Sequence, residues 1–152
     1  MVRRSALTVT LLLGLMVALA CSGDGGGPAG DEGLSRSAEA GAITVDGTWL
    51  TAATLDGVEA DLSAYPLDEF VLVEIAFTTH SGDLNEIDME AASGLKQGGA
   101  SGTPEAWVSK SDDSHHREGV LVFRRAQTDG PVELTVDLGD EEVALLWEAP
   151  PA

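Results

Sequence analysis

The chain has three histidines, and two of them stand side by side in "SKSDDSHHREGVLVF", as His115 and His116. The third, His80, lies in "AFTTHSGD". Neutral imidazole nitrogens are ligands for zinc and for divalent copper, and a carboxylate such as Asp83 or Asp113 also suits zinc. These residue types indicate a divalent transition-metal site, with a binding patch and a polar turn as the alternatives.

The segments that must position these histidines alternate as β-strands do. In "DEFVLVEIAFTTH" the odd-numbered residues from 71 to 77 are apolar, whereas Glu74 and Thr78 are polar. Successive side chains of a strand point to opposite faces, so the odd-numbered residues are predicted to face a core. If the strand continues regularly, His80 lies on the outer face with Glu74 and Thr78.

The same reasoning applies to "GVLVF". Leu121 and Phe123 are predicted to point inward, which places His116 outward and His115 inward. Two adjacent histidines then serve one site only if the chain turns or bulges, which Gly119 would allow. If the two strands are antiparallel neighbours, the end of the first meets the start of the second. In that case His80 and His116 share one rim and one face.

Short strand-like runs continue through the rest of the chain. "PVELTVDLG" and "EVALLWEAP" alternate cleanly and are predicted to form a hairpin through "LGDEE". In "AITVDGTWLTAATLDG" the Asp46-Gly47 pair predicts a turn between two strand pieces. The pattern is typical of an all-β fold, an antiparallel immunoglobulin-like β-sandwich of about six to eight short strands. Predicted core residues are Phe77, Leu121, Phe123, Leu134 and Trp147.

The region 83–110 has the least regular pattern. Its neighbours favour one or two irregular strands around the glycine-rich residues 98–102. "EIDMEAASGLK" also suits a short helix, because Ala, Glu, Leu and Met favour helices.

Residues 1–20 predict an export signal. Arg3 and Arg4 precede the apolar stretch Ala6–Ala20, which is short for a membrane-spanning helix. The stretch ends in "ALAC", directly before Cys21, the only cysteine in the chain.

"ALAC" resembles the lipobox of bacterial lipoproteins, whose signal is cut before a cysteine that is then lipidated. The family usually has Leu at the position that Ala18 occupies here. The resemblance implies a protein exported and lipid-anchored to the cell envelope, with the membrane as a partner through Cys21. Ser22 is compatible with the outer membrane of a two-membrane bacterium.

The mature chain is predicted to have two parts. Residues 21–42 are rich in Gly, Ser, Ala and acid, a composition typical of a flexible tether. Residues 43–149 are predicted to form one β-sandwich domain of ordinary size.

The chain is strongly acidic, with 26 Asp and Glu against 8 Lys and Arg and a net charge of −18. Removal of Arg3 and Arg4 with the signal would make it more negative still. This charge argues against nucleic acid and against an anionic membrane surface as partners. It fits the attraction of cations, or a surface that stays soluble at high salt.

A second resemblance covers about residues 70–125. Thr-His-Ser-x-Asp-Leu followed by Trp and His-His-x-x-Gly-x-Leu-x-Phe resembles a pattern in uncharacterised exported bacterial and archaeal proteins. It implies a shared histidine-centred site without naming a ligand. "SKSDDS" stands where a glycine-containing turn is expected. The matching residues are Thr79, His80, Ser81, Asp83, Leu84, Trp107, His115, His116, Gly119, Leu121 and Phe123.

Three classes of function follow. The first is a zinc or copper(II) site formed by His80, His116, His115 and Asp83. The second is a metal-free module that binds another envelope protein. The third is an enzyme, and it is not expected: His80, Ser81 and Asp83 are close in sequence, but no motif places a nucleophile beside an oxyanion hole.

Overall fold

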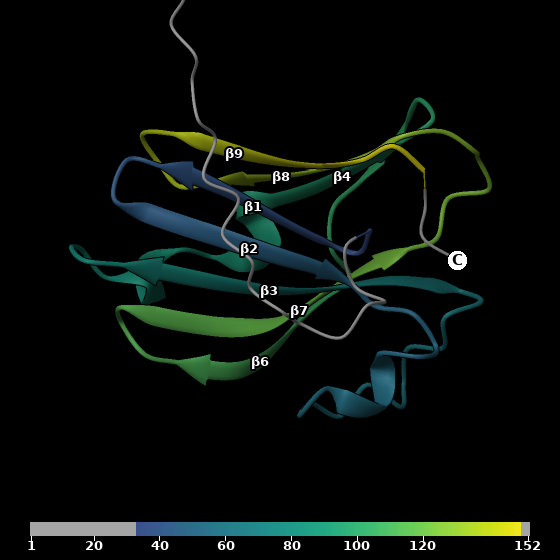
Figure 1. Cartoon of the computed structure of the whole chain (residues 1–152), viewed down its shortest axis with the longest axis horizontal. Coiled ribbons are helices and arrows are strands. Elements are labelled where there is room, and N and C mark those ends of the chain that lie inside the picture. Colours follow the sequence, from purple (N-terminus) through teal and green to yellow (C-terminus); the bar gives the residue numbers. More distant parts are fainter. Residues whose placement is uncertain (1–32, 150–152) are drawn as a thin grey trace, which may run out of the picture.

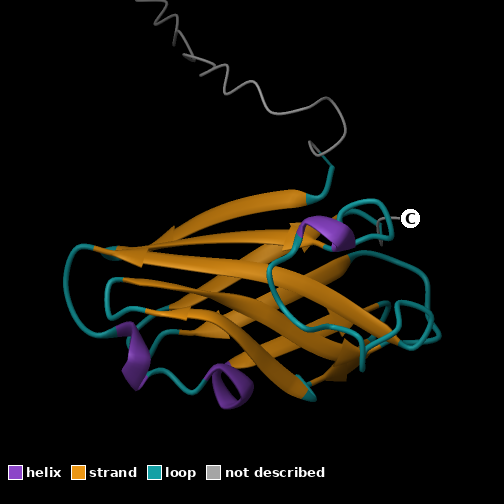
Figure 2. Ribbon diagram, turned by 90° about the horizontal axis from the view of Figure 1, so that it is seen from below, coloured by secondary structure: helices purple, strands orange, loops and turns teal. Residues whose placement is uncertain are grey.

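The fold consists of two antiparallel β-sheets packed face to face. The structure, a computed structural model, describes residues 33–149. The large sheet has the strand order β1-β2-β3-β7-β6, and the small sheet has the order β5-β4-β8-β9. Figure 1 and Figure 2 show the two layers, whose strands cross at an angle. The strand bounds are β1 Ser35–Ala40, β2 Ile43–Trp49, β3 Phe70–Thr79, β4 Ser93–Gln97, β5 Ala100–Gly102, β6 Ala106–Asp112, β7 His116–Arg124, β8 Val132–Asp137 and β9 Glu142–Trp147.

The predicted all-β sandwich is confirmed, and its core lies between the two sheets. Alternate residues of β3, β7, β8 and β9 point into this space, and β8 and β9 form the predicted hairpin. The rings of Trp49 and Trp147 meet edge to face at 5.7 Å between centroids. The five predicted core residues, Phe77, Leu121, Phe123, Leu134 and Trp147, are all buried.

The outer face of the large sheet carries a second apolar cluster that the alternation did not predict. Leu72 and Val122 are fully buried on this face, because the segment 50–69 folds back across it. This segment includes the short helix η1, Leu55–Gly57, at the lower right of Figure 1. The central strand β3 is therefore apolar on both faces over its first half.

Asp46-Gly47 does not form a turn, and the prediction of two strand pieces there is wrong. Both residues lie within the continuous strand β2, paired with β3. A Cβ on Gly47 would lie 2.5 Å from Cδ1 of Leu145 in the opposite sheet. The glycine lets the two sheets approach closely at this point, which is a packing role rather than a turn role.

The predicted tether extends too far, because residues 35–40 form strand β1. Every β1 residue pairs with β2, and Arg36 reaches β9, where its Nε donates to the Leu146 carbonyl at 2.6 Å. The inward-facing residues of β1 include the small side chains of Ala38 and Ala40, so its alternation is weak in the sequence. The predicted signal peptide, Cys21 and the first part of the tether lie outside the described residues.

The irregular region 83–110 contains both strands and short helices, the two kinds of element that its sequence favours. The short helix η2, Leu84–Glu86, and the four-residue helix α1, Met89–Ala92, precede the strands β4, β5 and β6. Asp88 caps α1 by accepting hydrogen bonds from the amides of Glu90 and Ala91. None of the helices within residues 33–149 is long and apolar enough to cross a membrane.

Candidate functional site

The end of β3 and the start of β7 meet at one rim of the sandwich. Thr78 is paired with His116 in the antiparallel ladder, and the amide of Thr79 donates to the carbonyl of His115 at 3.0 Å. His80 follows directly, in an exposed bend. The strand phases therefore placed His80 and His116 at the same end of the molecule.

The imidazole of His116 lies on the outer face of the large sheet, where both ring nitrogens have protein partners. Nδ1 is 3.1 Å from the hydroxyl of Thr78, and Nε2 is 2.8 Å from Oε1 of Glu118. The hydrogen bond from His116 is the main reason that the pKa of Glu118 lies below its usual value, and Lys110 adds to the effect. A metal ion would have to displace one of these contacts.

Lys110 extends this contact from the edge strand β6. The β6–β7 register shifts between Ser109 and Ser111, and Lys110 pairs with Glu74 and, at 3.5 Å, with Glu118. The hydrogen bond with Glu74 is the largest cause of a raised pKa for Lys110. A bulge and a lysine on an edge strand both discourage pairing with another chain.

The expected chain irregularity beside Gly119 therefore lies in β6, not in β7. Gly119 itself is packed under Trp107, and a Cβ at this position would lie 2.5 Å from Cζ2 of the indole. The glycine of the sequence pattern thus makes room for the tryptophan of the same pattern.

The carboxylates near the histidines hold turns. Asp113 accepts hydrogen bonds from the amides of His115 and His116, at 2.9 and 3.2 Å, and the first of these is the main cause of its lowered pKa. Asp83 accepts the amide of Asn85 at 3.0 Å. Among residues 33–149, no three side chains of His, Cys, Asp or Glu are grouped so that they could hold a metal ion.

Arg117 is the residue at this rim that sequence reasoning missed. Its Nη1 donates to the carbonyls of Leu84 and Ile87, at 3.0 and 2.7 Å, and its guanidinium lies 5.5 Å from the ring centroid of Trp107. The side chain is only 11% exposed. The signal was present in the strand phase, because an odd-numbered residue of β7 points inward like Leu121.

Arg117 and the amide of Leu84 together hold one wall of a groove. Leu84 is buried, and its amide donates to the carbonyl of Ser114 at 2.9 Å, which ties the segment after β3 to the histidine turn. Thr79 adds a third tie, because its hydroxyl donates to the carbonyl of Ser81 at 2.7 Å. Thr79, Ser81 and Leu84 of the sequence pattern thus help to hold this wall in place.

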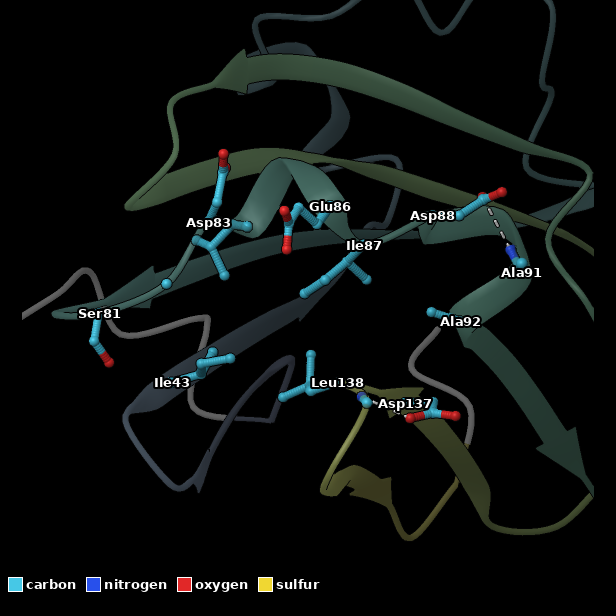
Figure 3. Close-up of a pocket in the computed structure, with 13 residues that line it drawn as sticks. Ile43, Ser81, Asp83, Glu86, Ile87, Asp88, Ala91, Ala92, Asp137 and Leu138 are labelled. Atoms are coloured by element: carbon cyan, nitrogen blue, oxygen red, sulfur yellow. Dashed lines mark hydrogen bonds between the residues drawn. The ribbon is translucent and has the colours of Figure 1, made fainter.

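The rim groove is an open depression of about 520 Å³ at the end of the sandwich. The segment 81–92 forms one wall, and the β8–β9 turn forms the other (Figure 3). Ile43, Ile87 and Leu138 converge on the space between the walls. The lining residues are Ile43, Ser81, Gly82, Asp83, Leu84, Glu86, Ile87, Asp88, Ala91, Ala92, Asp137, Leu138 and Gly139.

Acidic side chains surround this apolar floor, and none of the basic residues within 33–149 lines it. Asp83, Asp88 and Asp137 each use one carboxylate oxygen to accept a nearby backbone amide. Glu86 is exposed, and no hydrogen bond or ion pair to its carboxylate is found within residues 33–149. In Figure 3 the Asp83 carboxylate turns away from Leu138, whereas that of Glu86 lies over the groove.

The groove and the N-terminal entry of the chain lie at opposite ends of the sandwich. The carbonyl of Leu34 accepts hydrogen bonds from the amide of Trp49, at 3.0 Å, and from the indole of Trp147, at 2.8 Å. Those tryptophans end β2 and β9, whereas Ile43 begins β2 at the groove. In Figure 1, β1 runs from the entry toward the opposite end.

Among the described residues, the side chains of His80, Ser81 and Asp83 do not form a hydrogen-bonded catalytic set. Ser81 and Asp83 line the groove, but His80 does not. No hydrogen bond within residues 33–149 joins the side chains of His80, Ser81 and Asp83. Two of the tryptophans serve packing: Trp49 is buried in the core, and Trp107 packs against Gly119.

Comparisons with protein-family models, with curated proteins and with solved structures found no match for this chain. Its own geometry is therefore the basis for inferring its function.

Proposed function

We propose that this protein is a lipid-anchored, extracytoplasmic binding module. Its β-sandwich presents the rim groove to ligands that combine a positive charge with an apolar part. Cys21 carries the lipid, and the residues between Cys21 and β1 connect the lipid to the domain.

The position of the groove carries this proposal. The chain enters the sandwich at Leu34, and the groove lies at the other end. A domain attached through its N-terminal side therefore has the groove at the end farthest from the attachment point. Interaction with a second envelope component would then be unobstructed.

The chemistry of the groove supports the ligand class. An apolar floor gains free energy when an apolar group covers it, at roughly 25 cal/mol per Å² removed from water. The surrounding carboxylates favour a cation at the rim and disfavour an anion. The net charge of −18 attracts cations toward the whole surface, which speeds their encounter with the groove.

The hydrogen bonds of His116 make the alternative of a transition-metal module less favourable. Both ring nitrogens already have partners, Thr78 and Glu118. An incoming metal would have to compensate for the lost contacts as well as for dehydration of the ion. The groove needs no such rearrangement to accept a ligand.

A minimal ligand tests the proposal. Hexylammonium is titrated into the mature chain carrying Cys21→Ser, which removes the predicted lipid, and backbone amide shifts are followed by NMR. We expect the largest shifts at residues 81–92 and 137–139, with smaller shifts for hexanol and for tetramethylammonium at equal concentration. Shifts spread evenly over acidic surface residues would show diffuse ion attraction and would contradict the proposal.

A further inference from the structure

We infer that the natural occupant of the rim groove is an extended segment of a partner protein that alternates aliphatic with Lys or Arg side chains. This inference rests on the proposed function and adds the identity of the ligand class. It commits to a chain segment rather than to a small organic cation.

The floor of the groove sets the requirement for aliphatic side chains. Ile43, Ile87 and Leu138 are partly buried and pack against the main core, so each still presents apolar surface to the groove. Ala91 and Ala92 beside them are small and leave the space open. A Leu, Ile or Val side chain from a partner would cover this surface.

The rim sets the requirement for basic side chains on both sides of the aliphatic one. Glu86 and Asp88 stand on one wall, and Asp137 stands on the other. In an extended segment, the residues that flank an inward-pointing aliphatic group point away from the floor, and only side chains as long as Lys or Arg reach back to the carboxylates at the rim. The methylene stem of Lys or Arg can also lie along an apolar surface while its head reaches a carboxylate.

Glu86 is the residue best placed to select the positive charge. Its carboxylate lies over the groove, and it forms no ion pair within the described residues, so a partner would not have to displace an existing contact. Asp88 and Asp137 are already oriented by backbone amides. They offer their second oxygens from fixed positions, which lowers the entropy lost on binding.

The shape of the groove favours a chain segment over a small polyamine. The groove is open, with an apolar floor between two acidic walls, and a polyamine would neutralise the walls but leave most of the floor exposed to water. A segment of alternating chemistry satisfies both surfaces together. An experiment can separate the contribution of the apolar floor to binding from that of the acidic rim.

Three capped hexapeptides separate these contributions: alternating Lys and Leu, alternating Lys and Ser, and alternating Glu and Leu. Each is titrated calorimetrically into the mature chain carrying Cys21→Ser, with spermidine as the small polycation. We expect the Lys/Leu peptide to bind at one equivalent and the other three ligands to bind at least about tenfold more weakly. Equal binding of the Lys/Ser peptide or of spermidine would overturn the inference.

Matched variants locate the site. Glu86→Gln should weaken the Lys/Leu peptide about fivefold or more, whereas Glu59→Gln, with the same change in net charge on the 50–69 segment, should leave it unchanged. Leu138→Asn should weaken binding, whereas Leu146→Asn, at an exposed leucine toward the other end of the sandwich, should not. Equal losses in both glutamine variants would mean that net charge alone drives binding, and this would overturn the inference.

The result is separable from the test of the proposed function. Binding of hexylammonium in the groove without binding of the Lys/Leu peptide would leave the groove as a binding site and reject the chain segment. Absence of both would reject the groove itself.

Discussion

The indole ring of Trp107 occupies the space in which a side chain at position 119 would stand. A Cβ on Gly119 would lie 2.5 Å from Cζ2 of the ring and 2.6 Å from the carbonyl oxygen of Val108. The backbone carbonyl belongs to a paired strand and cannot move away easily. This contact couples β6 to β7 directly beside Arg117, whose guanidinium lies 5.5 Å from the ring centroid of Trp107.

Gly119→Ala should destabilise the protein by about 1–3 kcal/mol, because a methyl group is forced into a filled space between Trp107 and β6. Gly102→Ala is the matched control, since nothing lies within 4 Å of a Cβ there. Urea unfolding followed by tryptophan fluorescence measures both changes. A Gly119→Ala protein as stable as the Gly102→Ala control would contradict the close packing of Trp107 against Gly119.

Replacing Arg117 with Met should cost about 2–4 kcal/mol, because the carbonyls of Leu84 and Ile87 lose their donor. Arg117→Lys should recover only part of this stability, since an ammonium cannot reproduce the forked donation of a guanidinium. Amide hydrogen exchange should become faster at residues 84–88 in both variants. Unchanged exchange there would contradict the role of Arg117 in holding the groove wall.

The stability of the fold should depend on the ionisation of Glu118 in acid. The folded-state pKa of Glu118 is lowered from 4.5, mainly by the hydrogen bond from His116. Ionised Glu118 therefore stabilises the fold above pH 4.5, and this contribution is lost as the pH falls through the lower, folded-state pKa. Urea midpoints between about pH 3 and 6 should fall less steeply for Glu118→Gln than for the parent. Glu59→Gln serves as the control and should keep the slope of the parent.

Cys21→Ser should prevent lipidation and release the protein from membranes. The expectation follows from "ALAC" at the end of the predicted export signal, directly before the sulfur of Cys21 that would carry the lipid. Membrane fractionation and detergent phase partitioning measure the outcome. A variant that remains in the membrane fraction as the parent does would reject the lipoprotein interpretation.

Zinc and copper(II) should bind the mature chain no better in the parent than in His80→Ala or His116→Ala, because His116 is held by Thr78 and Glu118. Calorimetric titration at neutral pH measures this, with calcium and magnesium for comparison and Glu133→Ala as a distant control variant. One equivalent of zinc in the parent would instead establish a histidine site if both histidine variants lost it. Its affinity should then fall below about pH 6.5.

The fold class could be predicted from the sequence because it depends on a local property. In β8 and β9, apolar and polar residues alternate with a period of two, and a strand buried on one face requires nothing else. The inward positions of Phe77, Leu121 and Trp147 follow from that period alone. The same phases, with antiparallel pairing, brought the ends of β3 and β7 to one rim.

Other features depended on contacts between residues far apart in the chain. Gly47 suggests a turn beside Asp46, but the approach of Leu145 from the opposite sheet decided that it lies within a strand. Residues 35–40 alternate only weakly in the sequence, but they form strand β1 because they pair with β2 and Arg36 bonds to β9. Leu72 is buried only because the segment 50–69 crosses the sheet.

The features of the candidate site also divide into those that follow from the sequence and those that depend on tertiary contacts. The sequence by itself determined the acidity of the chain and the shared rim of His80 and His116, and it predicts an export signal before the single cysteine. Tertiary structure decided that Arg117 holds the 84–87 wall and that His116 pairs with Thr78 and Glu118. It also joined Ile43, Ile87 and Leu138 into one apolar floor. Local patterns set which face of a strand a side chain occupies, but only the packing of two sheets sets which distant side chains share a surface.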